Sequence, residues 1–360
     1  MRTTMAYTFA APARWLAAVA LLAAVAPPLV AQITVVVPCD RDNSLYESAS
    51  GSFSNGRGDS VFCGVTAQGR VRRTLLHFDV AAALPANAIV VAAEMHLHVI
   101  FSTAGAATEV AAHRVLQAWG EGTSFATAGG GGMGAPSTAG DATWAHAIYP
   151  NVSWPAGGDF ATTPSFVFSM PNLGSVSASA SVADVQDWLR NPGANHGWLL
   201  KTAEASLLDR TRRIDSRESA GPRPALQIVY LLPGTTGSWG TGCPHGSGTM
   251  ATQWVGVPTS GAPLQLVHGA APAMSLGASF FAFELVSSGF ELSPGCRVHL
   301  PVASGLVFGD LFATDGAGAA SSTFLLPAGY PGCLLVAQAL VLDGRVPELV
   351  LGNAALLVTQ

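Results

Sequence analysis

The stretch RRIDSRESAGPRPALQIVY, residues 212–230, combines the densest cluster of charges in the chain with an alternating apolar segment. Five of its first seven residues are ionisable. The alternation in PALQIVY predicts a β-strand, and Pro222 and Pro224 prevent its ladder from extending backward. Arg217 can form a bidentate ion pair, and Glu218 can accept backbone N–H groups. We interpret the charges as a brace for this strand, with a ligand site as the alternative.

The same period of two recurs in VRRTLLHFDV, residues 71–80, and in LPANAIVVAAEMHLHVIF, residues 84–101. Each segment predicts a strand with an inward apolar face. The side chains expected on the inward faces are Leu76, Phe78, Val80, Met95, Leu97 and Val99. Because a domain's closing strand often lies beside its first strand, we expect PALQIVY to pair near the start of the domain.

One helix is predicted, in SVADVQDWLRNPG, residues 181–193. Ser181 can cap its N-terminus, and Asp184 follows three residues later, as in a capping box. Asp184 and Asp187 are favoured there by the helix dipole, so we do not interpret them as a catalytic pair. Val185 and Trp188 or Leu189 belong to the apolar stripe.

Composition favours an all-β protein. Charged residues make up 11% of the 360 residues, whereas there are 40 glycines and 23 prolines, a composition typical of tightly turned β-structure. Lys201 is the single lysine and no basic tract is present, which argues against a nucleic-acid partner.

The first 31 residues resemble a secretory signal peptide. Arg2 and Arg14 precede or flank an apolar run over residues 15–26, and Pro-Pro follows it. We expect cleavage before Gln32, which places the protein outside the cell or at the cell surface. No later segment predicts a membrane span.

Two domains are expected. Gly, Pro, Ser and Thr crowd residues 231–248 and predict a boundary there. We expect an antiparallel jelly-roll or β-sandwich over residues 33–232 and a second, smaller β-sandwich-like domain over residues 233–360.

The five cysteines should pair where geometry permits in an exported protein. We expect one disulfide between Cys39 and Cys63 and another between Cys243 and Cys296. Cys333 is then left as a buried thiol packed in a strand, in preference to a reactive nucleophile.

The first domain resembles the DNRLRE-type domains, a group of bacterial carbohydrate-binding modules. Six segments in order carry the resemblance: RRTLLHFDV (72–80), VLQAWGEGTSF (115–125), GDATW (140–144), WPAGGDF (154–160), DVQDWLRNPGANHGWLLK (184–201) and DSRESAGPRPALQIVY (215–230). The resemblance implies an all-β jelly-roll on an exported protein. The eponymous string is absent, and its nearest counterpart is DSRE, residues 215–218.

The tail is similar to a C-terminal domain that recurs on secreted proteins of environmental bacteria. GTGCPHGSG opens it and GNAALLVTQ closes it. We carry over no function from this similarity.

The motifs of common enzymes are missing from the sequence. It contains no G-x-S-x-G, H-E-x-x-H, P-loop or strand-linked G-x-G-x-x-G pattern. We therefore expect a protein that is not an enzyme, with paired carboxylates from distant loops as the alternative.

Metal binding has two candidate sites. Asp141 and Asp159 lie in Gly-rich loops whose carbonyls could complete the oxygen shell of a structural calcium ion, although both could merely cap turns. His96 and His98 share one face of a strand, and His77 could lie on a neighbouring strand. We expect no cofactor other than such a calcium.

Loop aromatic residues indicate sugar binding. Aromatic faces stack on the C–H surfaces of pyranoses, and Trp144, Tyr149 and Trp154 share one loop, although packing could also explain the tryptophans. Arg72 with Arg70, Arg210 and Arg212 would favour an acidic polysaccharide, unless these arginines are simply solvated.

These patterns lead to one expectation and two alternatives. We expect a secreted, non-catalytic protein that binds a polysaccharide or other glycan at the cell surface or in the extracellular matrix. The first alternative is a structural or adhesive envelope protein with no sugar site. The second is an enzyme with a loop-borne site.

Overall fold

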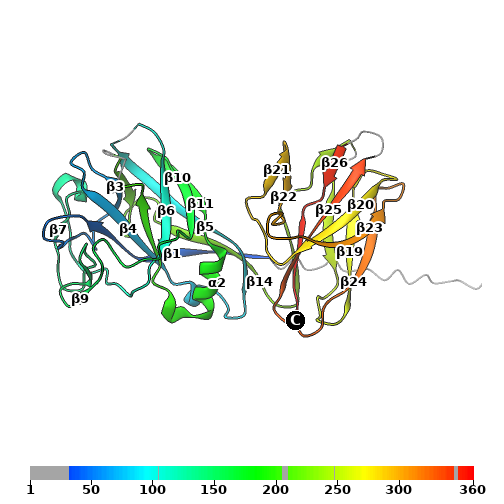
Figure 1. Ribbon diagram of the computed structural model, residues 1–360, viewed down its shortest axis with the longest axis horizontal. Helices are drawn as coiled ribbons and strands as arrows, with labels where there is room; N and C mark the ends of the chain where they lie inside the picture. The colour runs from blue at the N-terminus through cyan, green and yellow to red at the C-terminus, as the bar shows by residue number, and fades with distance from the viewer. Residues whose placement is uncertain (1–31, 104, 205–209, 247, 344–347) are drawn as a thin grey trace, which may run out of the picture.

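The structure, a computed structural model, describes residues 32–103, 105–204, 210–246, 248–343 and 348–360 (Figure 1). It consists of two lobes built almost entirely from antiparallel strands, which confirms the expected all-β class. The expected signal peptide, residues 1–31, lies outside the described residues. Within the described part of the chain, no helix has the length and apolarity needed to cross a membrane.

The first lobe is a sandwich of two sheets, here called the β5 sheet and the β4 sheet. The β5 sheet contains β5 Ile89–Ser102, β11 Gly174–Ser179, β13 Arg212–Asp215 and β14 Ala225–Leu231. The β4 sheet contains β4 Val71–Phe78, β6 Thr108–Arg114, β10 Phe166–Met170 and β12 Trp198–Thr202. β1 Ile33–Tyr46 and β3 Ser60–Val65 pair with strands of both sheets.

β1 changes sheets at a register shift between Cys39 and Arg41. Before the shift it pairs with β14, from Ile33 opposite Tyr230 to Pro38 opposite Ala225. After the shift it pairs with β4. The first and closing strands of the lobe are therefore neighbours, as the sequence predicts, and one strand fastens the two sheets together at this corner.

The main core lies between the two sheets. All six side chains that the alternation places inward are buried there: Leu76, Phe78, Val80, Met95, Leu97 and Val99. Helix α2, Val182–Arg190, closes one end of this core, with the ring of Trp188 4.5 Å from that of Trp198. Ser181 Oγ accepts a hydrogen bond from the Asp184 amide at 3.2 Å, so the expected cap is confirmed. A short helix, α1 Val80–Ala83, follows β4.

A second core lies on the outer face of the β4 sheet. Leu45, Leu75 and Leu199 point outward from their strands and are buried beneath a layer of loops that supplies Trp119 and Trp154. Residues 115–160 form this loop layer, with only short elements of regular structure. These are η1 Ala128–Gly131, β7 Ala135–Pro136, β8 His146–Ile148 and β9 Val152–Ser153; β2 Phe53–Ser54 pairs with β7, and η2 Pro192–Ala194 follows α2.

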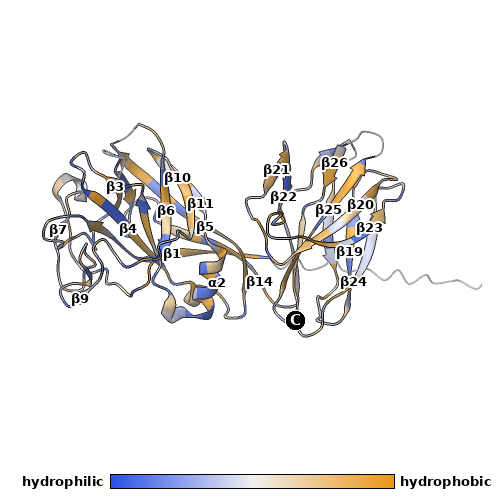
Figure 2. Cartoon of the chain, viewed as in Figure 1, coloured by the Kyte–Doolittle hydropathy of each residue, from blue (hydrophilic) through white to orange (hydrophobic). Residues whose placement is uncertain are grey.

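The second lobe is a smaller sandwich, and Figure 2 shows hydrophobic residues concentrated along the strands of both lobes. Its larger sheet contains β15 Thr235–Trp239, β20 Leu276–Ala282, β23 Val307–Ala313, β25 Leu334–Asp343, β26 Glu348–Leu351 and β27 Ala354–Val358. Its smaller sheet contains β18 Ala251–Val255, β19 Pro263–Gly269 and β24 Ala320–Leu325. Two ribbons complete it, β16 Pro244–His245 with β17 Gly248–Thr249 and β21 Phe290–Ser293 with β22 Cys296–Val298.

The junction between the lobes is a tight turn rather than a long linker. β14 ends at Leu231 and β15 begins at Thr235, whose amide donates to the carbonyl of Leu232 at 3.2 Å. One apolar cluster spans the junction, with Val91 and Leu231 of the first lobe packed with Leu356 and other residues of the second. The two lobes therefore share buried surface.

The disulfide prediction is half right. Cys243 and Cys296 are bonded, whereas Cys39 and Cys63 are buried free thiols. Cys39 pairs with Phe78 of β4, while Gly64, next to Cys63, pairs with Arg72 at the other end of that strand. Six residues of strand separate the two positions by about 20 Å, far beyond the reach of a disulfide.

Replacing Ser181 with alanine should remove the cap of α2 and lower the free energy of unfolding by about 1 kcal/mol. Ser175 of β11 is exposed, and its hydroxyl has no hydrogen-bond partner among the described residues, so Ser175→Ala is the matched control. Urea denaturation of the two variants measures the difference. Equal loss in both would show that the cap contributes nothing.

Candidate functional site

The three loop aromatics predicted to bind sugar are not exposed together. Trp154 is only 7% exposed, belongs to the outer core, and donates its indole N–H to the carbonyl of Thr143 at 2.9 Å. Its role is to anchor the β8–β9 hairpin to the sheet below, so its assignment as a sugar-stacking residue is wrong.

Trp144 and Tyr149 are each half-buried. The Arg73 guanidinium lies over the Trp144 ring at 4.9 Å and is held by Glu204 through two hydrogen bonds of 2.7 Å. Part of Trp144 is thus already covered by a charged side chain. The Tyr149 and His146 rings meet in a T-shaped arrangement with centroids 5.2 Å apart, and both residues are only half-buried on the hairpin.

The four arginines do not form one solvated basic face, because Arg72 and Arg212 are buried, whereas Arg70 is exposed and Arg210 is half-buried. Arg72 is buried, and its guanidinium lies over the Tyr46 ring, 4.9 Å from the centroid. Its Nε donates a hydrogen bond to the Gly132 carbonyl at 3.1 Å. Arg212 is fully buried and donates to the carbonyls of Pro171 at 2.9 Å and Ala106 at 2.5 Å. Both guanidinium groups are used in hydrogen bonds to backbone carbonyls of the lobe, so the assignment of Arg72 to ligand binding is wrong.

The two aspartates predicted to hold calcium have different environments. Asp141 is fully buried and accepts hydrogen bonds from the amides of Ser124 at 3.3 Å and Thr138 at 2.5 Å. Its geometry is that of the turn cap kept as the alternative. Asp159 is half-buried, and among the described residues neither aspartate belongs to a group of three metal-ligating side chains.

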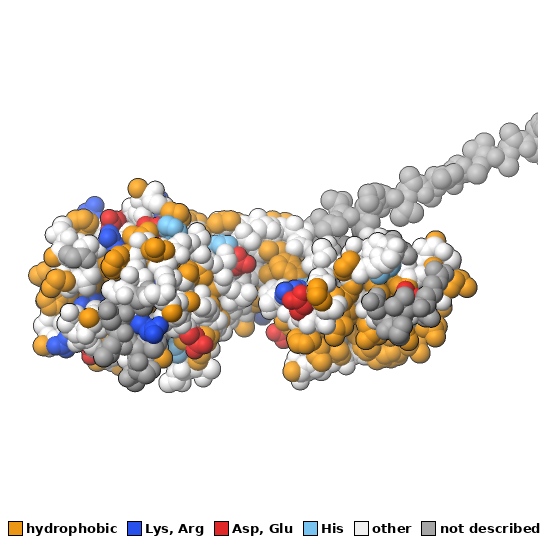
Figure 3. Space-filling view, turned by 90° about the horizontal axis from the view of Figure 1, so that it is seen from above, with side chains coloured by type: hydrophobic (Ala, Val, Ile, Leu, Met, Phe, Trp, Pro, Cys, Tyr) orange, Lys and Arg blue, Asp and Glu red, His pale blue; other side chains and the backbone are white. Residues whose placement is uncertain are grey.

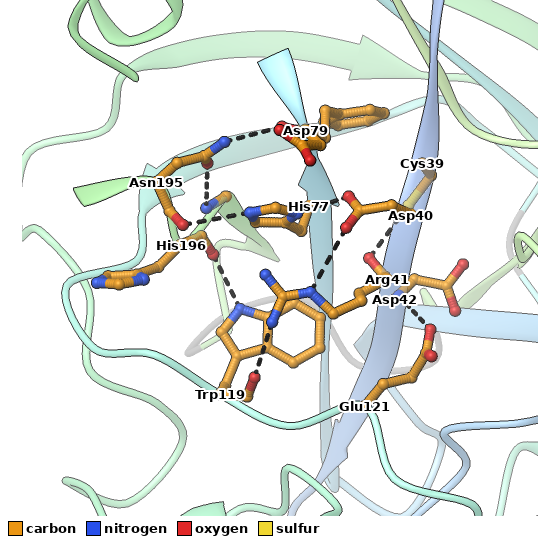
Figure 4. A network of polar contacts seen from close by, with 12 residues as sticks. Cys39, Asp40, Arg41, Asp42, His77, Asp79, Trp119, Glu121, Asn195 and His196 are labelled. Carbon is orange, nitrogen blue, oxygen red and sulfur yellow. Dashed lines mark hydrogen bonds and ion pairs between the residues drawn. The ribbon is translucent and has the colours of Figure 1, made fainter. Parts of the chain in front are cut away.

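The three histidines lie on opposite sides of the sandwich. His98 on β5 contacts Asp215 at 2.8 Å, and His96 contacts the Ser177 hydroxyl at 2.9 Å. His77 lies on β4, where Nδ1 contacts Asp40 at 2.5 Å (Figure 4). A shared histidine metal site is therefore not formed.

The charged stretch before β14 contributes to a compact ionic network. Arg217 forms a bidentate ion pair with Glu121, with Nε–Oε1 at 2.6 Å and Nη2–Oε2 at 3.0 Å. The same Nε lies 2.9 Å from the Glu218 carboxylate. The Arg217 amide donates to Asp42 Oδ2 at 2.6 Å. The network joins β1, the loop layer and the turn before β14, which is the geometry of a brace.

Figure 4 shows the neighbouring part of this network along β1. The Asp42 amide donates to Glu121 at 3.0 Å. Arg41 lies over the Trp119 ring at 5.3 Å and donates to the Trp119 carbonyl at 3.2 Å, while the Trp119 indole donates to His196 at 2.8 Å. Trp119 and Glu121 thus fasten the loop layer to β1 at two adjacent points.

Burial dominates the electrostatics of the network. Asp42 is 1% exposed, and burial, followed by the nearby Glu218 and Glu121, raises the pKa of its carboxyl well above the usual value. Burial also raises the pKa of Glu218. The Glu121 hydrogen bonds raise the pKa of Arg217 further above its ordinary value. Three carboxyl groups thus surround a single guanidinium at this point.

Sequence reasoning found Arg217 and Glu218 but missed two partners. Glu121 lies in the family-like segment VLQAWGEGTSF, which could have identified it. Asp42 lies in CDRDN, where no spacing distinguishes it from a surface residue.

The free thiols are poor nucleophiles. Burial raises the pKa of Cys39 well above its usual value and that of Cys63 to about 12. Cys333 is half-buried just before β25 rather than packed within the strand, and burial raises the pKa of its thiol as well. Each is protonated at neutral pH, so none is activated for attack.

No model of a known protein family matches the chain, and no curated protein sequence matches it. The resemblance to DNRLRE-type modules therefore stays a prediction from sequence motifs.

Replacing Asp42 with asparagine should stabilise the protein in metal-free buffer at pH 7 by about 1 kcal/mol, because it removes a buried charge without changing side-chain shape. Folding raises the pKa of Asp42, so its protonation favours the folded state, and this stability is lost as the pH rises through the folded pKa.

The advantage of Asp42→Asn should therefore shrink as the pH is lowered towards the ordinary aspartate range. Denaturation at a series of pH values, with EDTA present, measures the difference between variant and wild type. A difference independent of pH would contradict the assigned cause.

Proposed function

We propose that the protein is a secreted, non-catalytic carbohydrate-binding protein of the cell surface or extracellular matrix, and that its first lobe is a DNRLRE-like module. The observation that carries the proposal is the β8–β9 hairpin, which presents the half-exposed pair Tyr149 and His146 on a rigid support. An aromatic face held in this way is suited to stack on a sugar ring.

The rigidity of the hairpin comes from the contacts beneath it. Trp154 is buried in the outer core, and the Tyr149 backbone exchanges hydrogen bonds with its loop neighbours, donating to Asp141 and accepting from Gly140, both at 2.8 Å. Asn151, exposed at the hairpin tip, offers an amide for sugar hydroxyls. A preformed surface of this kind loses little conformational entropy on binding.

The burial of Arg72 and Arg212 changes the preferred class of ligand. Without a solvated arginine face, and with a formal net charge of −5, the protein has little attraction for acidic polymers. We therefore favour a neutral polysaccharide over an acidic one.

Replacing Tyr149 with alanine should weaken binding about tenfold, the equivalent of one lost aromatic stacking contact. Affinity gel electrophoresis with xylan as the neutral polymer and polygalacturonate as the acidic polymer measures retention. Tyr330→Ala, which removes an exposed tyrosine from the second lobe, is the matched control. Equal retention of Tyr149→Ala and wild type would refute the site, and no retention of wild type on any polymer would refute sugar binding.

A structural or adhesive envelope protein is the second candidate, and the apolar outer face of the larger sheet in the second lobe favours it. Leu276 and Leu311 are 73% and 78% exposed, and Leu342 and Leu349 are about half-exposed. Leu342 pairs with both Leu276 and Leu349 across the strands, so the exposed leucines are contiguous. Figure 3 shows hydrophobic side chains gathered on this lobe. Exposed apolar patches of this kind mark interaction surfaces.

Replacing Leu342 with lysine should reduce retention of the protein on a hydrophobic-interaction column, because it places a charge in the middle of the leucine patch. Val36→Lys, at an exposed apolar position of β1 in the first lobe, is the control. If both variants elute like the wild type, the leucine patch does not act as an adhesive surface.

A further inference from the structure

Three carboxylates converge on one point of the first lobe. Asp42, Glu121 and Glu218 each direct one carboxylate oxygen into a group whose members all lie within 4.8 Å of one another. They come from β1, from the loop layer and from the turn before β14, so only the folded lobe brings them together. We propose that this group is a binding site for a hard divalent cation, with Ca²⁺ as its ligand.

The spacing of the oxygens fits one ion. Ca²⁺ binds oxygen at about 2.3–2.6 Å, so two ligands on opposite sides of the ion lie about 5 Å apart. The 4.8 Å limit of this group allows all three oxygens to contact a single ion. Asp42 is buried, whereas the side chains of Glu121 and Glu218 keep 15% and 22% of their surface exposed, which gives water access to complete the shell.

The second carboxylate oxygen of Asp42, which takes no part in the ionic network, provides an independent observation. Asp42 Oδ2 accepts a hydrogen bond from the Arg217 amide. Asp42 Oδ1, by contrast, is buried and has no hydrogen-bond partner among the described residues. Buried carboxylate oxygens are normally satisfied by donors or by a metal. A cation between the three carboxylates would satisfy this one.

The charges also fit a divalent ion. Three carboxylates carry a charge of −3 when ionised, and the Arg217 guanidinium offsets one unit, which leaves −2. A bound Ca²⁺ makes the group neutral.

The chemistry of the ligands separates calcium from the softer metals. The group contains only carboxylate oxygens, without histidine or cysteine, which suits Ca²⁺ and does not suit Zn²⁺ or copper. The site is also distinct from Asp141 and Asp159, whose loops the sequence suggested. Arg217 keeps its two bonds to Glu121 when the ion binds, and Glu218 exchanges its contact with Arg217 for one with the metal.

Isothermal titration calorimetry of the EDTA-treated protein with CaCl₂ tests the proposal. We expect one equivalent of Ca²⁺ to bind with a Kd on the order of 10⁻⁴ M, as in extracellular modules, and to raise the thermal unfolding temperature. Asp42→Asn and Glu218→Gln should each weaken binding about tenfold or more, since each removes one charged ligand. Asp159→Asn, which changes a loop aspartate outside the group, should bind like the wild type.

Two results would overturn the site. The first is a wild-type protein that shows neither binding heat nor a thermal shift at millimolar Ca²⁺. The second is loss of binding in Asp159→Asn with binding retained in Asp42→Asn. Glu218→Gln keeps the Arg217–Glu121 pair and the buried Asp42, so it carries the test if Asp42→Asn does not fold.

Thermal unfolding of the wild type and Asp42→Asn, each measured in EDTA and in saturating Ca²⁺, separates a metal site from a merely crowded group of acids. In EDTA, Asp42→Asn should be the more stable protein, because its buried charge is gone. At saturating Ca²⁺ the order should reverse, because the wild type binds Ca²⁺ more tightly than the variant and is therefore stabilised more by it. An unchanged order would show that the group binds protons and not calcium.

Discussion

The pairing of β1 with strands of both sheets is the constraint on which the first lobe depends. Because β1 is hydrogen-bonded to β14 before its register shift and to β4 after it, the two sheets cannot separate without breaking one continuous strand. The Arg217 network sits beside this strand and holds Asp42 of β1, Glu121 of the loop layer and the turn before β14 in one position. The core, the loop layer and the closing strand therefore share a single fixed corner.

The period-two pattern predicted the inner faces of this lobe correctly, because a residue's place in a pleated strand is a local property. It could not predict what covers the outer face. Leu75 lies on the side of β4 opposite Leu76, and only the fold shows that a loop layer with Trp154 buries it. The sugar-binding assignment of Trp154 failed for this reason, since an exposed loop tryptophan and a packed one look alike in sequence.

The site was only partly predictable for a similar reason. Arg217 and Glu218 stand out as charges in a chain that has few, but their partners are 96 and 175 residues away along the sequence. No local rule connects Asp42 to that turn. Arg72 and Arg212 misled in the opposite direction, because these two buried arginines are hydrogen-bonded to backbone carbonyls, whereas the sequence alone presents them as solvated.

The antiparallel pairing of β1 with β14 has a mechanical consequence. Ile33 at the start of β1 lies opposite Tyr230, one residue before β14 ends and the chain turns into the second lobe. A pulling force applied between the start of β1 and the second lobe would act on this ladder from one end. The hydrogen bonds between β1 and β14 would then break one after another rather than all at once. The lobe would yield to tension in that direction more readily than to a force that slides the two strands past each other.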